Sequence, residues 1–169
     1  MTRFLTAVIF TLLFSGQVWA QTSVTTQAYA EIIAALTATE TSQLNFGRFY
    51  PGVTGGEVII SPDGVKSAQG SVMLSGGTSS PGRFTITGAP DATFSIQLPE
   101  GPVQLLHQGS NQTMVVNQWT SDPPAGFSSG TLNEGSEIVS IGASLVVGSV
   151  ENNPVGIYTG SFSLTFAYN

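Results

Sequence analysis

Large apolar residues alternate with polar ones in short runs along most of the chain, and glycine or proline separates one run from the next. Alternation with a period of two predicts β-strands, because successive side chains of a strand point to opposite faces. Many short strands with turn residues between them predict an all-β protein, and we expect a β-sandwich. The expected strands are residues 44–49, 57–61, 71–74, 83–87, 93–98, 103–106, 113–119 and 137–147.

Three segments carry more specific expectations. Residues Gly88–Asp91 lie between two expected strands and consist of turn formers, so they predict a β-hairpin. Gly142 interrupts the longest apolar run and predicts a β-bulge. Residues 28–36 are ambiguous, because their alanines favour a helix whereas the threonines that follow favour a strand. We expect the first strand over Glu31–Thr39, with a short helical turn near Ala30 as the alternative.

The N-terminal residues predict where the protein works. A short basic start, Met1–Arg3, is followed by the apolar run Phe4–Phe14 and by small residues that end at Ala20. This layout predicts a secretory signal peptide that is cleaved after Ala20, so we expect an exported protein. The apolar run is shorter than the roughly 20 residues of a membrane span. The expected organisation is a signal peptide (1–20), an N-terminal extension (21–30) and one β-sandwich domain (31–169).

Charge and cysteine content narrow the function classes. The chain carries 4 basic and 10 acidic residues, and only 8% of its residues are charged, against about 25% in a typical soluble domain. After loss of Arg3, the basic residues are too few to form the phosphate-binding patch that nucleic-acid recognition requires. The chain has no cysteine, which excludes disulfides, thiol catalysis and thiolate metal sites. Packing alone must therefore hold the fold.

The candidate catalytic pattern is weak. Residues Gly126–Gly130 match the Gly-x-Ser-x-Gly pattern of a nucleophilic serine, here Ser128. That motif requires a strand-to-helix turn and a histidine later in the chain, whereas the single histidine, His107, comes earlier. Trp119 is expected in the core, and a sugar-stacking platform with Phe127 is the alternative. We expect a protein that is not an enzyme and has no catalytic residue, no cofactor and no metal site.

The C-terminal residues, 156–169, form the sharpest pattern in the chain. Large apolar side chains share one face of an expected strand, and threonine, serine and alanine occupy the other. The pattern resembles the C-terminal strand of fimbrial (pilus) subunits of the chaperone–usher type. Those subunits carry a penultimate aromatic residue, alternating apolar residues before it and a glycine fourteen places from the end. The matching residues, expected to form an assembly strand, are Gly156, Phe162, Leu164, Phe166 and Tyr168.

Most of the expected domain also resembles a secreted bacterial family known only as a domain of unknown function. An early Leu-x-Phe-Gly pattern occurs at residues 44–47, and a Phe-x-Ile-x-Gly pattern at residues 84–88. A run of the type Ile-Gly-Ala-x-Leu-x-Val follows at residues 141–147, and the chain closes with Gly-x-Tyr-x-Gly-x-Phe and Tyr-Asn within residues 156–169. The resemblance implies a single immunoglobulin-like β-sandwich.

The fimbrial resemblance implies a mode of assembly. In those subunits the sandwich lacks its last strand, so the sheet edge is incomplete and leaves an open apolar groove. A periplasmic chaperone fills the groove first, and the N-terminal extension of the next subunit replaces it at an outer-membrane usher, which implies self-association into a polymer. The expected location is therefore the periplasm in transit and then the cell surface, a fimbrium or the medium. The candidate donor residues in the extension are Val24, Thr26, Ala28 and Ala30.

Two alternatives remain open. The candidate donor side chains are smaller than those of typical donor strands, so the extension could instead complete its own domain. The protein would then be a free-standing secreted binding or coat domain. An eight-stranded outer-membrane barrel is the second alternative, and it is disfavoured because several expected runs fall short of the roughly 9 to 11 residues that a membrane strand needs.

Overall fold

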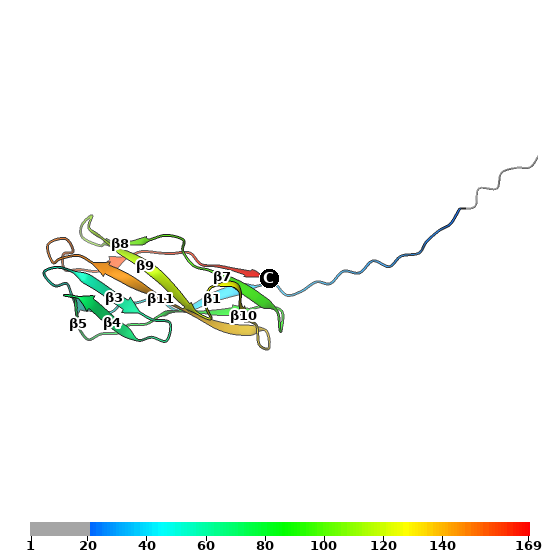
Figure 1. Cartoon of the computed structure of the whole chain (residues 1–169), viewed down its shortest axis with the longest axis horizontal. Helices are drawn as coiled ribbons and strands as arrows, with labels where there is room; N and C mark the ends of the chain where they lie inside the picture. Colours follow the sequence, from blue (N-terminus) through cyan, green and yellow to red (C-terminus); the bar gives the residue numbers. More distant parts are fainter. Residues whose placement is uncertain (1–20) are drawn as a thin grey trace, which may run out of the picture. The chain divides into compact units, whose positions relative to one another are not determined.

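The computed structural model describes residues 21–169 (Figure 1). The expected signal peptide, Met1–Ala20, lies outside these residues. The chain divides into two units, Met1–Ile32 and Ile33–Asn169. Residues 21–32, the described part of the first unit, contain no strand or helix, and all their side chains are exposed. The second unit carries the fold.

The second unit is built from strands alone among the described residues, which confirms the all-β expectation. The strands are β1 (Thr37–Ser42), β2 (Phe49–Tyr50), β3 (Gly56–Ile60), β4 (Lys66–Gly70), β5 (Met73–Leu74), β6 (Gly82–Thr87), β7 (Thr93–Gln97), β8 (Val103–His107), β9 (Thr113–Asp122), β10 (Gly126–Thr131), β11 (Ser136–Val147), β12 (Tyr158–Thr159) and β13 (Thr165–Tyr168).

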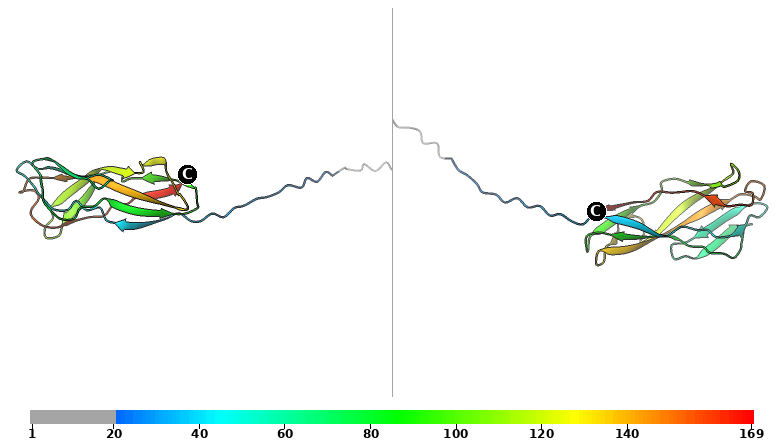
Figure 2. Two further views of the ribbon diagram at one scale, coloured as in Figure 1. Left: turned by 90° about the horizontal axis from the view of Figure 1, so that it is seen from below. Right: turned by 180° about the vertical axis from the view of Figure 1, so that it is seen from behind.

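The strands form antiparallel sheets that pack as a β-sandwich (Figure 2). The larger sheet has the order β1-β6-β11-β9-β8-β12, and β3 and β4 extend it beside β11. A smaller sheet has the order β10-β7-β13, and β2 pairs with β5 alone. The consecutive strands β7 and β8 belong to different sheets, and so do β12 and β13. The connections between these strands therefore carry the chain from one sheet to the other.

Strand β11 is the centre of the larger sheet. It pairs with β6 and β3 along one edge and with β9 along the other, so residues 139–145 are buried on both faces. Gly142 sits where a Cβ atom would collide with the carbonyl oxygen of Ile60, so only glycine fits. The pairing with β9 shifts register between Gly142 and Ser144. This shift confirms the β-bulge that the sequence predicts.

The hydrophobic core consists of two clusters between the sheets. Trp119 packs against both clusters and thus links them. The first contains Phe46, Val58, Ile60, Val72, Met114, Val116, Ala143, Leu145 and Val147, and the second contains Ile86, Phe94, Ile96, Leu132, Val139 and Ile141.

Two local predictions were wrong. The first strand begins at Thr37 rather than at Glu31, and residues 31–36 form neither strand nor helix. The expected hairpin at Gly88–Asp91 does not form, because β6 pairs with β1 and β11 whereas β7 pairs with β10 and β13. The four residues instead carry the chain from one sheet to the other. Two of their backbone N–H groups donate to residues 132–135, from Gly88 N to Gly135 O at 3.0 Å and from Asp91 N to Leu132 O at 2.9 Å.

Candidate functional site: an open apolar groove

The C-terminal segment, residues 156–169, runs along β8 and then along β7 (Figure 1). Tyr158 is paired with His107 of β8, and Thr165 is paired with Gln97 of β7, in both cases antiparallel. The expected long terminal strand is thus present as two short strands, β12 and β13. One backbone edge of the segment is bonded to the sandwich over both of them.

Burial along this segment alternates, as its sequence pattern predicts. The large side chains pack against the core but stay half-buried, and the residues between them are exposed. A half-buried aromatic side chain still has a free face, because no strand among residues 21–169 covers the segment on its other side. The half-buried side chains are Tyr158, Phe162, Leu164, Phe166 and Tyr168.

Tyr168 ties the end of the segment to the rest of the domain. Its hydroxyl accepts a hydrogen bond from Ala89 N at 2.7 Å and donates one to Ala34 O at 2.9 Å. The hydroxyl lies so close to Gly88 that a Cβ atom on that residue would collide with it. Gly88 is therefore required for the position of the tyrosine ring. At this end the segment lies beside the residues that lead into β1.

Gly156 has a related steric role at the start of the segment. The His107 ring lies against its backbone, and any side chain at that position would collide with the ring. Nδ1 of His107 accepts a hydrogen bond from Gly109 N at 3.0 Å, so the other nitrogen, Nε2, carries the proton that it donates to Val155 O at 3.2 Å. The ring also packs edge-on against Tyr158, with centroids 4.9 Å apart. The histidine thereby holds the terminal segment in place.

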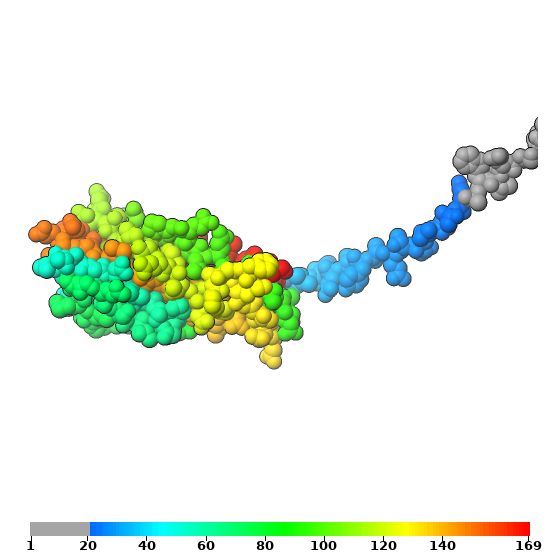
Figure 3. All heavy atoms as spheres, in the orientation of Figure 1, coloured from blue at the N-terminus to red at the C-terminus, as the bar shows by residue number. Residues whose placement is uncertain are grey.

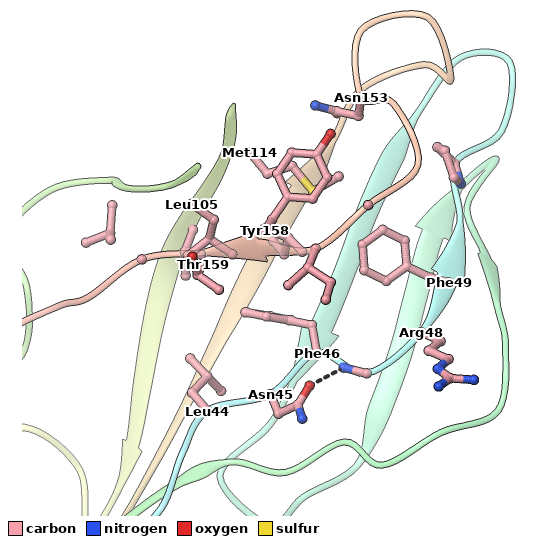
Figure 4. A pocket seen from close by; sticks show the side chains of 18 of the residues that line it. Leu44, Asn45, Phe46, Arg48, Phe49, Leu105, Met114, Asn153, Tyr158 and Thr159 are labelled. Atoms are coloured by element: carbon pink, nitrogen blue, oxygen red, sulfur yellow. Dashed lines mark hydrogen bonds between the residues drawn. The ribbon is translucent and has the colours of Figure 1, made fainter. Parts of the chain in front are cut away.

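An apolar groove with a volume of about 740 Å³ opens beside this segment (Figure 4). One wall is the terminal segment from Asn153 to Phe162, and the other is the segment 43–51. Figure 4 shows Leu44, Phe46 and Phe49 on one side and Tyr158 on the other. The floor is formed by side chains of the core, namely Val103, Leu105, Met114, Val116, Trp119 and Leu145.

Both walls use only one of their two backbone edges. The segment 43–51 bonds outward, through Asn45 to Ser80 at 2.8 and 2.9 Å and through the pairing of β2 with β5. The terminal segment bonds outward to β8. Within residues 21–169, no backbone hydrogen bond joins one wall to the other. The groove therefore lies between two strand edges, each with unused N–H and C=O groups along it.

Trp119 reaches the groove because β9 is irregular. The bulge against β11 places Gln118 at a φ of 49°. Val116 faces the core, so strict alternation would turn residue 119 away from it. The residue that the bulge inserts reverses the alternation, so the Trp119 side chain faces the core. The centroids of the Trp119 and Phe162 rings lie 4.6 Å apart. Its Nε1 atom is buried without a hydrogen-bond partner in the described chain. The sequence prediction that Trp119 belongs to the core is correct, whereas Phe127 is exposed.

The groove carries little charge. Arg48 is the one charged residue among those that line it, and Lys66 donates to its backbone oxygen at 2.9 Å. Burial lowers the pKa of Lys66 and raises the pKa of the Tyr158 hydroxyl, which donates to Pro154 O at 2.9 Å. A surface of this kind suits an apolar or uncharged occupant.

The residues weighed for catalysis are not brought together. Ser128 lies in β10 with a φ of 57°, and its hydroxyl contacts the side-chain amide of Asn169 at 3.3 Å. Neither ring nitrogen of His107 is bonded to Ser128. Over the part of the chain that is described, no three His, Asp or Glu residues gather as metal ligands.

The candidate donor residues lie in the first unit, in residues 21–32. Val24, Thr26, Ala28 and Ala30 are exposed and belong to no strand. Among residues 21–169, no helix is long and apolar enough to cross a membrane.

The sequence indicates one wall of the groove but not the groove itself. Alternation marks the terminal segment, whereas residues 44–49 have the pattern of an ordinary strand. The signal was the apolar pattern of Leu44, Phe46 and Phe49, of which Phe46 is buried in the core whereas Leu44 and Phe49 stay half-buried.

The match to known families falls on the second unit. Residues 36–168 match a family described as a domain of unknown function (DUF4402), and the chain belongs to this family. The matched region contains the terminal segment up to Tyr168 and the whole of the opposite wall, and it begins after the exposed residues 21–32. No curated protein and no solved structure matches the chain.

Proposed function

We propose that the protein is a structural subunit of a surface or fimbrial assembly and that its groove accepts an extended segment of another chain. The observation that carries this proposal is the groove between two unused strand edges, with the terminal segment as one wall. A strand inserted there would bond to both edges and would place alternate side chains on the apolar floor, which is the mode of binding called β-augmentation.

The form of the groove supports a strand rather than a compact ligand. Its wall at 43–51 is nine residues long, which sets an upper limit of about 30 Å on its length at roughly 3.3 Å per extended residue. An extended occupant of nine or ten residues would match this length. The fold is then an immunoglobulin-like sandwich with one strand missing, as the resemblance to fimbrial subunits implies.

The candidate occupant is the extension Gln21–Ala30 of a second copy, which is ten residues long. In an extended conformation, Val24, Thr26, Ala28 and Ala30 lie on one face and would point to the groove floor. Before assembly, the open groove would expose apolar surface and strand edges, and such surfaces aggregate. The proposal therefore includes export, a periplasmic chaperone and usher as partners, and no enzymatic activity.

The free-standing secreted domain is the second candidate function. The small side chains of Thr26, Ala28 and Ala30 favour it, because they would fill a groove of about 740 Å³ poorly. In that case the groove would stay open to another ligand, and the protein would remain a monomer.

A charge placed on the donor face distinguishes these functions. Ala28→Asp would bring a carboxylate to the apolar floor, whereas Gln27→Asp, on the opposite face, would leave it in solvent. We expect the exported wild type and the Gln27→Asp variant to form chains that electron microscopy and light scattering detect, and the Ala28→Asp variant to be defective. Wild-type protein that stays monomeric, or equal behaviour of the two variants, contradicts the proposal.

A further inference from the structure

At one end of the groove, large apolar side chains are exposed on both of its walls. Tyr50 on one wall is 60% exposed, and Val155 and Ile157 on the other are 90% and 62% exposed. We call these three residues the rim. Single exposed apolar residues are ordinary, but three of them around the mouth of one groove form a contact surface.

The two walls reach the same end of the domain. Gly55, just after Tyr50, lies against the backbone at Val147 and Gly148, and Gly148 N donates to the side chain of Asn153 at 2.5 Å. Figure 3 shows the segments near residues 50 and 150 meeting at one end of the molecular surface. The groove runs from this end to Phe162 and Leu44.

At the opposite end, the terminal segment is bonded to the residues that lead into β1. Beyond Phe162 the terminal segment packs onto the second core cluster, where the ring centroids of Phe166 and Phe84 lie 6.2 Å apart. The Tyr168 hydroxyl then joins the segment to Ala34. In the arrangement that we infer, an occupant followed by a folded domain leaves the groove at the rim, because the Tyr168–Ala34 bond obstructs the other end. The occupant's first residues point to Phe162, and the occupant runs antiparallel to the terminal segment.

We propose that the rim is a second contact site, which takes Ile32 and Ile33 of the copy whose extension occupies the groove. This inference rests on the proposed function. Ten residues, Gln21–Ala30, span the nine-residue wall, so the next residues of the same chain emerge at the rim. Ile32 is 99% and Ile33 is 55% exposed. Two bulky apolar residues thus meet an exposed apolar rim, which offsets the small side chains within the groove.

The test is a mutant cycle in the full exported chain. In the proposed assembly, each interface between neighbouring copies joins Ile32 and Ile33 of one copy to the rim of the other. One variant carries Ile32→Ser and Ile33→Ser, a second carries Val155→Ser and Ile157→Ser, and a third carries all four changes. The readout is the rate at which assembled chains dissociate after dilution into mild denaturant. Each substitution changes only an exposed side chain, and Ile138→Ser, at an exposed position that does not line the groove, is the matched control.

We expect each double variant to dissociate about tenfold faster than the wild type or more, and the fourfold variant to be no faster than the double variants. Two results would overturn the rim contact while the groove proposal stands. In the first, the fourfold variant dissociates faster than the wild type by the product of the two factors measured for the double variants. In the second, the double variants dissociate at the same rate as the Ile138→Ser control. A wild type that never assembles would remove the groove proposal and the rim contact together.

Discussion

The hydroxyl of Tyr168 offers the most direct test of how the terminal segment is held. Tyr168→Phe removes the acceptor for Ala89 N and the donor to Ala34 O. The second bond is exposed, so water can replace it, whereas the partly buried Ala89 N–H would lose its partner. An unsatisfied N–H of this kind costs about 1–3 kcal/mol. We expect the free energy of unfolding to fall by about 2 kcal/mol.

The second arm of this test uses the close approach of Gly88. Gly88→Ala places a methyl group against the Tyr168 hydroxyl and 2.9 Å from Leu132 Cδ1, and overpacking of this kind costs about 1–3 kcal/mol. When the hydroxyl is absent, part of that overlap disappears. The double variant, Gly88→Ala with Tyr168→Phe, should therefore be less destabilised than the sum of the two single variants, by at least about 0.5 kcal/mol.

Urea unfolding of the mature chain, followed by tryptophan fluorescence, measures all of these variants. With an m-value of about 1–3 kcal/mol/M, a loss of about 2 kcal/mol lowers the midpoint by roughly 1 M. Tyr50→Phe is the control, because that tyrosine is exposed and its hydroxyl makes no hydrogen bond in the described chain. A Tyr168→Phe midpoint equal to that of this control, or strict additivity with Gly88→Ala, would refute the reasoning.

Four further predictions concern the terminal segment and the chemistry around it. Leu164→Asp places an unpaired charge against the second core cluster and should strongly reduce the yield of soluble exported protein, whereas Thr165→Asp, on the exposed face, should give a yield near that of the wild type. Gly156→Val should lower the free energy of unfolding by about 1–3 kcal/mol in urea, because the added side chain collides with the neighbouring imidazole ring. Ser128→Ala should leave the fold by circular dichroism and any measured biological activity unchanged, and a loss of activity without unfolding would contradict the proposed non-enzymatic role. Because burial raises the pKa of Tyr158, the folded state keeps that proton longer than the unfolded state does, so stability should fall as pH rises above about 10, and Tyr158→Phe should reduce this fall.

The fold class could be predicted because its cause is local. Alternation of apolar and polar residues fixes which side chains a strand can bury, and strands β3, β6, β7, β8, β9 and β11 overlap the expected ones closely. Strand β4 was missed because Ala68 is its only apolar residue, and its place depends on backbone bonds to β3. Position within a sheet, rather than side-chain pattern, creates such a strand.

Pairing and the groove could not be read from the sequence, because they depend on residues far apart in the chain. The turn residues at Gly88–Asp91 fit a hairpin as well as they fit a crossing between sheets, and the pairing of β6 and β7 with distant strands decides between these outcomes. The groove likewise requires that two segments about a hundred residues apart lie opposite each other without pairing. A bulge at Gln118 adds Trp119 to its floor, and the sequence around that residue gives no sign of one.

The bond between Tyr168 and Ala34 also has a consequence for engineering. The bond joins Ala34, near the start of the sandwich, directly to Tyr168, near its end, and it lies away from the rim. A short flexible linker from Asn169 to Ile33 can therefore close the domain into a ring, and new termini can be opened in an exposed loop such as residues 150–152. A circular permutant of this kind separates the sandwich from its N-terminal extension. A peptide or label fused near Asn169 would likewise project from the end of the domain where Ala34 lies and would leave the groove mouth unobstructed.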